Sequence, residues 1–224
     1  MLKAIIFDFD GVLADTEPLH FKMFRQVLQE EEISLTEQDY YQKYVGFDDK
    51  GCFGAILAEH GCAARPETIH RLVQRKAALL LGHIQTARVV YPGVPEFVKE
   101  AAVRYRLAIV SGALRHEIEL ILDGVGLRPS FEHITAAEDV RDGKPAPEGY
   151  LHALQALNRR APLLASECLV IEDTVFGIQA AHAAGMRCLA LTTNSSAERL
   201  GTADAVAPML KGYDLQTLER RFWS

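Results

Sequence analysis

Short, almost wholly apolar runs recur along the chain, and segments with helical spacing of apolar residues separate them. These runs cover residues 3–8, 107–110, 168–171, 186–191 and 204–206. Runs of this length are typical of strands buried on both faces of a parallel sheet, with the last one a short edge strand. Helices are expected over residues 94–104, 116–124, 147–158 and 174–184. Strands that alternate with helices predict an α/β fold with a doubly wound parallel sheet.

The segment from 16 to 86 breaks this alternation, because it contains helical patterns and no strand pattern. Helices are expected there over residues 18–30, 36–45, 49–60 and 66–81. The last of them begins with a proline, which favours the first turn of a helix. A block of helices directly after the first strand predicts a cap domain over the carboxyl edge of the sheet. We therefore expect a core domain of 1–15 with 87–224 and a helical cap domain of 16–86.

The composition excludes several classes of protein. With 224 residues, of which 49% are hydrophobic, the chain can bury a substantial core without metal or disulfide crosslinks, and disorder is excluded. The formal net charge of −6 and the lack of a basic run argue against a nucleic-acid or anionic-membrane partner. No apolar stretch approaches the length of a membrane span or of a signal segment.

The cysteines form neither a C-x-x-C pair nor a zinc-binding spacing with histidine, which favours reduced thiols. We therefore expect a cytoplasmic globular protein. No apolar surface stripe can be separated from the core by pattern alone, and the expected state is a monomer or a weak dimer.

Polar residues with chemical potential follow the predicted strands. In an open parallel sheet, ligands bind where the carboxyl ends of the strands meet the loops and the helix N-termini. The residues at these ends are Asp8 and Asp10, then Ser111 and Gly112, then, after the region 133–135, the stretch 142–145 with Lys144, and finally Glu172 and Asp173. Four strand ends thus direct carboxylates, a hydroxyl group and an ammonium group toward one crevice.

This set of groups favours phosphoryl transfer with a metal ion. Asp8, Glu172 and Asp173 offer the hard oxygen ligands that Mg²⁺ prefers. A carboxylate that attacks a phosphate meets a repulsion of about 4 kcal/mol per pair of unit charges at 4 Å and an effective dielectric near 20. The local positive charge must therefore come from Mg²⁺ and from Lys144.

The remaining groups suit the other roles of such a reaction. Ser111 and backbone N–H groups after the strands can hold phosphoryl oxygens. Asp10 lies two residues beyond Asp8, where the loop can turn it toward the leaving oxygen as a general acid and then as a base. Each feature alone has a plainer interpretation, since an isolated D-x-D is usually a solvated turn. Their joint order at successive strand ends makes coincidence improbable.

In this order the residues resemble the haloacid dehalogenase superfamily, in its phosphatase and β-phosphoglucomutase branch. Residues 7–16 resemble the first motif of that family, Ser111 the second, 143–145 the third, and 171–186 the fourth. The resemblance spans essentially the whole chain, and the first and fourth motifs are highly specific. The helical insert is similar to the small helical cap of the family.

The resemblance implies a role for each of these residues. Asp8 would be the nucleophile that forms an aspartyl-phosphate, and Asp10 would protonate the leaving group and then activate water. Mg²⁺ would be held by the Asp8 carboxylate, the Asp10 backbone carbonyl and Asp173, with Glu172 close by. Lys144 would neutralise Asp8 and the phosphoryl group. The second aspartate disfavours dehalogenation, because the dehalogenases that gave the superfamily its name lack it.

Two activities on small phosphorylated metabolites remain open at this point. The first is phosphomonoester hydrolysis, with a sugar phosphate or phosphoglycolate as substrate, and the second is a β-phosphoglucomutase-type isomerisation. Thr16, His20 and Lys76 match positions that couple cap closure to the site in the mutase. The arginine that binds the distal phosphate in the mutase falls at Asp49, where a carboxylate repels phosphate, although the neighbouring Lys50 compensates partly.

The segment after Ser111 also departs from the mutase, because its lysine–asparagine pair becomes Leu114 and Arg115. We expect Gly112 and Arg115 to contact substrate together with His20, Lys50 and Lys76. For His20, packing into an apolar helix face is an equally good interpretation. Hydrolysis is preferred over the mutase reaction. A receiver-like phospho-accepting switch is a third hypothesis, but Lys144 precedes the acidic pair here, and receiver domains lack a helical insert.

Overall fold

A computed structural model describes residues 1–84 and 89–223. Within them the strands form a six-stranded sheet in the order β3-β2-β1-β4-β5-β6, and every neighbouring pair is parallel. The strands are β1 (Ala4–Phe7), β2 (Arg106–Val110), β3 (His133–Thr135), β4 (Cys168–Glu172), β5 (Arg187–Leu191) and β6 (Ala205–Ala207). The predicted doubly wound parallel sheet is therefore confirmed.

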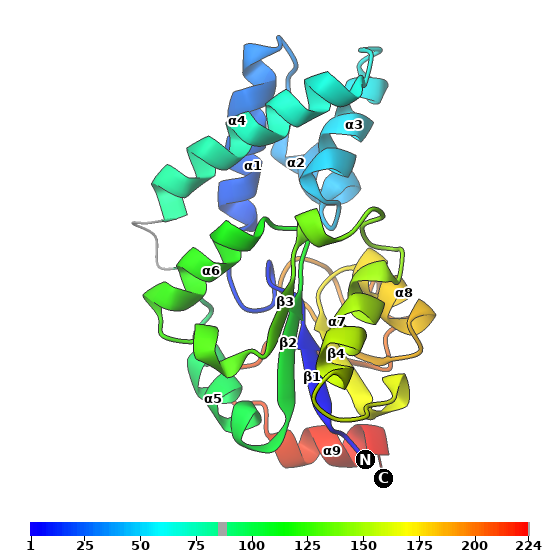
Figure 1. The fold of residues 1–224 in the computed structure, drawn as a ribbon. Coiled ribbons are helices and arrows are strands. Elements are labelled where there is room, and N and C mark those ends of the chain that lie inside the picture. The colour runs from blue at the N-terminus through cyan, green and yellow to red at the C-terminus, as the bar shows by residue number, and fades with distance from the viewer. Residues whose placement is uncertain (85–88, 224) are drawn as a thin grey trace.

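Helices cover both faces of this sheet (Figure 1). One face carries α5 (Val94–Arg104), α6 (Arg115–Gly124) and α9 (Leu215–Trp223), and the other carries α7 (Glu148–Asn158) and α8 (Val175–Ala183). Successive residues of a strand point to opposite faces, so the central strands are apolar throughout and supply two separate cores.

Strand β1 illustrates this division of the core. Ile5 and Phe7 belong to the cluster with α5, α6 and α9, whereas Ala4 and Ile6 belong to the cluster with α7 and α8. The Phe7 ring packs edge-on against Phe97, with ring centroids 6.2 Å apart. Burial on both faces fixes the height at which β1 ends, and with it the position of the loop that follows.

The helices α1 (Glu17–Glu30), α2 (Glu37–Asp39), α3 (Asp49–Glu59) and α4 (Pro66–Ile84) lie together beyond the carboxyl ends of the strands (Figure 1). They enclose an apolar cluster of their own, which includes Phe24, Phe53 and Leu72. The helix expected over 36–45 is divided, because a π-helical turn (Tyr40–Tyr44) follows α2 directly. The expected domain boundary between 86 and 87 lies outside the described residues, and the division into two domains stays a prediction.

The other expected elements agree with the structure to within a few residues, and the helix predicted over 94–104 is confirmed at both ends. Helix α9 was not predicted. Its buried residues Leu215, Leu218 and Phe222 have the spacing of one helix face and pack against the same side of the sheet as α5. Among the described residues, no helix combines the length and the apolar character needed to cross a membrane.

The N-terminal part of α8 closes over the end of β4. Glu172, the last residue of β4, is completely buried, and a Cβ atom added at Gly177 would lie 1.8 Å from its Oε1 atom. Thr174 caps the helix, because its Oγ1 accepts a hydrogen bond from the Gly177 N–H at 3.0 Å. Only glycine at position 177 leaves room for a buried carboxylate beneath the helix.

We expect Gly177→Ala to destabilise the protein by about 1–3 kcal/mol, because the new methyl group overlaps a carboxylate that has no space to move. Urea unfolding measures the change. Gly82→Ala is the matched control, since a Cβ there meets nothing within 4 Å in an exposed part of α4. That control should be neutral or more stable by up to about 1 kcal/mol. Equal stability of the two variants would contradict the expected overlap.

Candidate active site

A pocket lies at the carboxyl edge of the sheet, between the strand ends and the helices α1 and α3. Most of the candidate residues from the sequence line it together. Its polar lining residues on the core side include Asp8, Asp10, Ser111, Asp142 and Lys144, and those on the helical side include Glu17, His20, Asp48 and Asp49. Gly112 and Gly143 line it as well. The four strand ends therefore converge on one place.

Lys144 connects two of the strand ends. Its Nζ atom lies 2.7 Å from Asp8 Oδ1 and 2.5 Å from Glu172 Oε1. Burial acts to lower the pKa of Lys144, but the two carboxylates outweigh it and raise that pKa above its ordinary value. The side chain therefore stays charged at the base of the pocket, where it neutralises part of the acidic cluster.

Glu172 is held from all sides. Its Oε1 also accepts a hydrogen bond from the Tyr150 hydroxyl at 2.8 Å. Its Oε2 accepts from the Asp173 N–H, the Thr174 N–H and the Thr174 hydroxyl at 3.0–3.2 Å. Because both oxygens are engaged, the geometry favours a role in which Glu172 orients Lys144 over one as a primary metal ligand.

A metal ion fits beside Asp8. Asp8, Glu172 and Asp173 each offer an oxygen atom, and the three atoms lie within 4.8 Å of one another. Asp173 Oδ1 is buried and has no hydrogen-bond partner in the described part of the chain, while its Oδ2 accepts from Asn194 at 2.9 Å. Hard carboxylate oxygens around an unsatisfied buried position suit Mg²⁺ or a similar cation.

The pKa values of this cluster lead to the same conclusion. Burial raises the pKa of Asp8 to about 8, although Lys144 acts to lower it. Burial together with the charge of Asp8 raises the pKa of Asp173 well above its ordinary value. A nucleophilic carboxylate must be ionised, and a divalent cation between these residues would restore the ionised forms.

The loop after Asp10 approaches Asp173 closely because of Gly11. This residue has a φ of 77°, in the left-handed region, and a Cβ atom there would lie 2.1 Å from Asp173 Oδ2. The Thr193 hydroxyl donates to the Gly11 carbonyl oxygen at 2.6 Å. Sequence reasoning missed Thr193 and Asn194, although they follow the strand predicted over 186–191, where the same strand-end rule could have found them.

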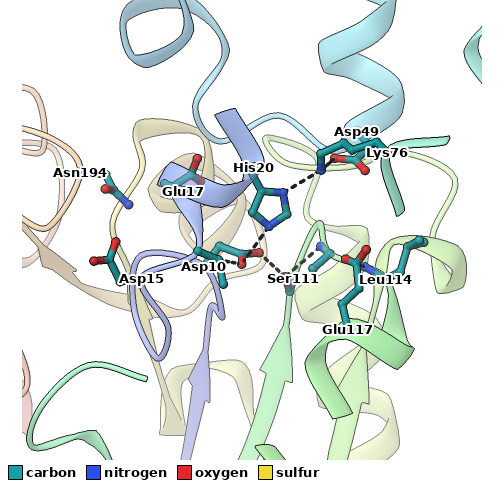
Figure 2. A network of polar contacts seen from close by, with 12 residues as sticks. Asp10, Asp15, Glu17, His20, Asp49, Lys76, Ser111, Leu114, Glu117 and Asn194 are labelled. Carbon is teal, nitrogen blue, oxygen red and sulfur yellow. Dashed lines mark hydrogen bonds and ion pairs between the residues drawn. The ribbon is translucent and has the colours of Figure 1, made fainter. Parts of the chain in front are cut away.

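Asp10 is the centre of a second network (Figure 2). Its Oδ1 accepts a hydrogen bond from the Thr16 hydroxyl and lies 3.5 Å from His20 Nε2, and its Oδ2 accepts from the Ser111 hydroxyl at 3.3 Å. Burial acts to raise the pKa of Asp10, but His20 and Thr16 together outweigh burial and lower it. The lowered pKa favours the ionised form of Asp10 in this arrangement, which suits the role of a base.

His20 links Asp10 to the buried lysine of α4. Lys76 is completely buried, and its Nζ lies 2.7 Å from His20 Nδ1 and forms an ion pair with Asp49 (Figure 2). An ammonium group only donates hydrogen bonds, so Nδ1 accepts and Nε2 carries the proton that faces Asp10. The His20 ring therefore links Lys76 of α4 to Asp10 through its two nitrogen atoms. This agrees with the sequence analysis, which named His20 and Lys76 among the residues that couple the helical segment to the site.

A further buried acid supports the Ser111 loop and was missed by sequence reasoning. Glu117 accepts a hydrogen bond from the Leu114 N–H at 3.2 Å through Oε2, and burial raises its pKa. The Ser111 hydroxyl also accepts from the Ala113 N–H at 3.0 Å. Glu117 is the third residue of α6, and an acidic residue at that position is a capping signal that can be recognised in the sequence.

Three expected substrate residues do not line the pocket. Lys76 is completely buried and lies outside the lining. Lys50 is exposed and does not belong to the lining. The Arg115 guanidinium donates to the Ile134 carbonyl oxygen at 3.1 Å and forms an ion pair with Asp139, also away from the lining. Asp48 lines the pocket instead, although the sequence analysis did not name it as a substrate residue. It is the N-cap of α3 and faces the core loops.

Known proteins resemble this chain in sequence and in structure. Protein CbbY of Rhodobacter capsulatus is 32% identical over 193 residues, which cover 83% of each chain. Fructose-1-phosphate phosphatase YqaB of Escherichia coli (strain K12) is 32% identical over 183 residues, which cover 81% of this chain and 92% of that protein. The crystal structure of β-phosphoglucomutase from Clostridium difficile has a TM-score of 0.88 at 22% identity and covers 99% of this chain and 97% of its own.

The last of these likenesses shows the fold alone, whereas the first two also extend to sequence. A family model described as haloacid dehalogenase-like hydrolase matches residues 5–191. This match runs from β1 through β5 and takes in Asp8, Ser111, Lys144 and Asp173. The chain belongs to the haloacid dehalogenase-like hydrolases.

Proposed function

We propose that the protein is a Mg²⁺-dependent phosphomonoester hydrolase that acts on a small phosphorylated metabolite through an aspartyl-phosphate at Asp8. The observation that carries this proposal is the contact of Lys144 with Asp8 beside the unpartnered buried oxygen of Asp173. A carboxylate that can attack phosphorus, a fixed ammonium group and a carboxylate oxygen that could hold a cation meet at one point, as phosphoryl transfer requires.

In the first half of the reaction, an Asp8 carboxylate oxygen attacks phosphorus and the bond from phosphorus to the substrate oxygen breaks. Asp10, which must carry a proton when the substrate binds, gives that proton to the leaving oxygen, so the substrate departs as an alcohol. Lys144 offsets the negative charges of Asp8 and the phosphoryl group, which otherwise repel each other. The Ser111 hydroxyl donates a hydrogen bond to Asp10 in the structure, and it is placed to donate to a phosphoryl oxygen when substrate is bound.

In the second half, a water molecule attacks phosphorus and gives its proton to Asp10, and the bond from Asp8 to phosphorus breaks. Orthophosphate leaves, and both carboxylates return to their starting forms. Mg²⁺ would be held by the Asp8 carboxylate, Asp173 and the Asp10 backbone carbonyl, where it supplies positive charge to the phosphoryl oxygens. The lowered pKa of Asp10 suits its role as base in this step.

The helical segment would serve as a cap over this site. We infer this from the pocket, which has α1 and α3 residues on one side and strand ends on the other. The segment also has its own apolar cluster, as a separately folded unit requires. His20 and Lys76 connect it to Asp10, so movement of the cap would change the hydrogen bonds of the general acid and base.

The relatives support hydrolysis of a sugar phosphate, because the Escherichia coli protein is named as a fructose-1-phosphate phosphatase. The mutase remains the alternative on the evidence of fold, through β-phosphoglucomutase. A mutase must bind a second phosphate in the cap, and the residue at that position is Asp49, which pairs with Lys76. This pairing leaves hydrolysis the better supported activity.

We expect Asp8→Asn to abolish hydrolysis of p-nitrophenyl phosphate, because an amide cannot form the acyl-phosphate. Asp10→Asn should lower kcat by about 10²–10⁴-fold, the range for loss of a general acid and base. Circular dichroism should show both variants folded. The control Asp123→Asn changes the same charge on an exposed residue of α6 and should keep full activity. Activity retained in both site variants would refute the assignment.

Chelation with EDTA should remove the activity, and added Mg²⁺ should restore it. Asp173→Asn should require at least tenfold more Mg²⁺ for half-maximal rate, because the amide lowers the charge of the site. Mg²⁺ should also raise the Tm of the wild-type protein, since it relieves repulsion between buried carboxylates, and raise that of Asp173→Asn much less. A Tm and a rate that do not respond to Mg²⁺ would exclude the metal site.

Incubation with β-glucose 1-phosphate and a trace of its 1,6-bisphosphate separates the two activities. A phosphatase releases orthophosphate in proportion to substrate consumed, and no glucose 6-phosphate accumulates. We expect this result, because no lysine or arginine among the described residues that line the cap side of the pocket could bind the second phosphate. Formation of glucose 6-phosphate without net phosphate release would establish the mutase instead.

A further inference from the structure

Acidic side chains line both ends of the pocket, Asp8, Asp10 and Asp142 at the core end and Glu17, Asp48 and Asp49 at the cap end, and the ends differ in whether a lysine accompanies them. The core end holds Lys144, which is the one lysine or arginine among the described residues that line the pocket. The cap end presents Asp48 and Asp49. When Asp8 attacks phosphorus in line, the leaving group lies on the opposite side of phosphorus, toward the cap. The leaving group therefore meets the carboxylates of the cap end.

Asp48 is placed over the two loops that carry the core residues. A Cβ atom added at Gly143 would lie 3.3 Å from Asp48 Oδ2, and one at Gly112 would lie 3.5 Å from Asp48 Cβ. Gly112 follows Ser111 and Gly143 precedes Lys144, so Asp48 overhangs the phosphoryl position from the cap side.

Only one of the Asp48 oxygens is used by the fold. Oδ1 accepts a hydrogen bond from the Gly51 N–H at 2.7 Å and caps α3. Among the described residues, Asp48 forms no ion pair, so the negative charge of its carboxylate is not neutralised by a side chain. Oδ2 remains as an acceptor that faces the pocket.

The nearest cation of the cap is not available to a substrate. Lys76 is completely buried, and its ammonium group is already engaged by Asp49 and His20. It neutralises Asp49 without contributing positive charge to the pocket surface. A second phosphate or a carboxylate on the leaving group would therefore find no cation at the cap end.

We propose that Asp48 selects leaving groups that donate hydroxyl hydrogen bonds and carry no negative charge, so that the substrates are monophosphates of sugars or polyols. An ionised carboxylate only accepts hydrogen bonds, so a hydroxyl group satisfies it and an anionic group is repelled by it. This inference rests on the proposed phosphatase activity, and it excludes phosphoglycolate-type and bisphosphate substrates from the preferred class.

Three matched pairs of substrates test this selection, because the members of each pair differ in a terminal hydroxyl against a carboxylate. They are glycerol 3-phosphate with 3-phosphoglycerate, sorbitol 6-phosphate with 6-phosphogluconate, and 2-hydroxyethyl phosphate with 2-phosphoglycolate. We expect the neutral member to have at least tenfold higher kcat/KM in every pair. The preference should shrink as salt is raised, since part of the repulsion is screened.

The variant Asp48→Asn removes the charge and keeps the shape. Asparagine also caps helices well, so α3 should remain intact. We expect the preference for the neutral member to fall at least threefold, mainly through faster turnover of the anionic member. Glu67→Gln removes the same charge from an exposed position of α4 outside the pocket, and its preference should equal that of the wild type.

Hydrolysis of p-nitrophenyl phosphate distinguishes the two levels of failure. If that compound is hydrolysed but neutral and anionic members react alike, or none of the six reacts, the selection by Asp48 is overturned and the phosphatase activity stands. An unchanged preference in Asp48→Asn overturns it as well. If p-nitrophenyl phosphate is not hydrolysed under any metal condition, the proposed function itself fails and this inference fails with it.

Discussion

Repulsion between buried carboxylates is the constraint on which this structure depends. Asp8, Glu172 and Asp173 are each less than a tenth exposed and present oxygens within 4.8 Å of one another. Burial of like charges at such distances is strongly unfavourable unless a cation compensates. Lys144 compensates two of them through direct contacts. The third, Asp173, retains an unpartnered oxygen, and a cation beside it could compensate its charge.

The parallel sheet is what forces these charges together. In the register of β1 and β4, Phe7 lies opposite Ile171, so the next residues, Asp8 and Glu172, emerge side by side. The two faces of β1 pack into different cores, with Ile5 and Phe7 in one and Ala4 and Ile6 in the other. A shift by one residue would turn every side chain into the wrong core, which fixes the register. Gly177 then leaves the space in which Glu172 can accept its hydrogen bonds beneath α8.

The core side of the site was predictable from the sequence because its geometry follows from strand ends, and strand ends follow from apolar runs. Asp8, Ser111 and Lys144 therefore line one pocket as expected. The cap side was less predictable, because the direction of a cap side chain depends on how the helices pack. Neighbouring residues 48 and 50 illustrate this, since the first faces the core loops and the second is exposed. Sequence spacing alone does not distinguish them.

Charge also couples the two sides of the pocket. Lys76 is buried in the cap, where an uncompensated ammonium group would be strongly unfavourable, so Asp49 must stay paired with it. The same ammonium group fixes the His20 ring, whose other nitrogen faces Asp10. Neutralisation of Asp49 would therefore do more than remove a negative charge from the cap side of the pocket. It would leave His20 as the remaining hydrogen-bond partner of the Lys76 ammonium group. The change would alter the hydrogen bonds that set the proton affinity of Asp10.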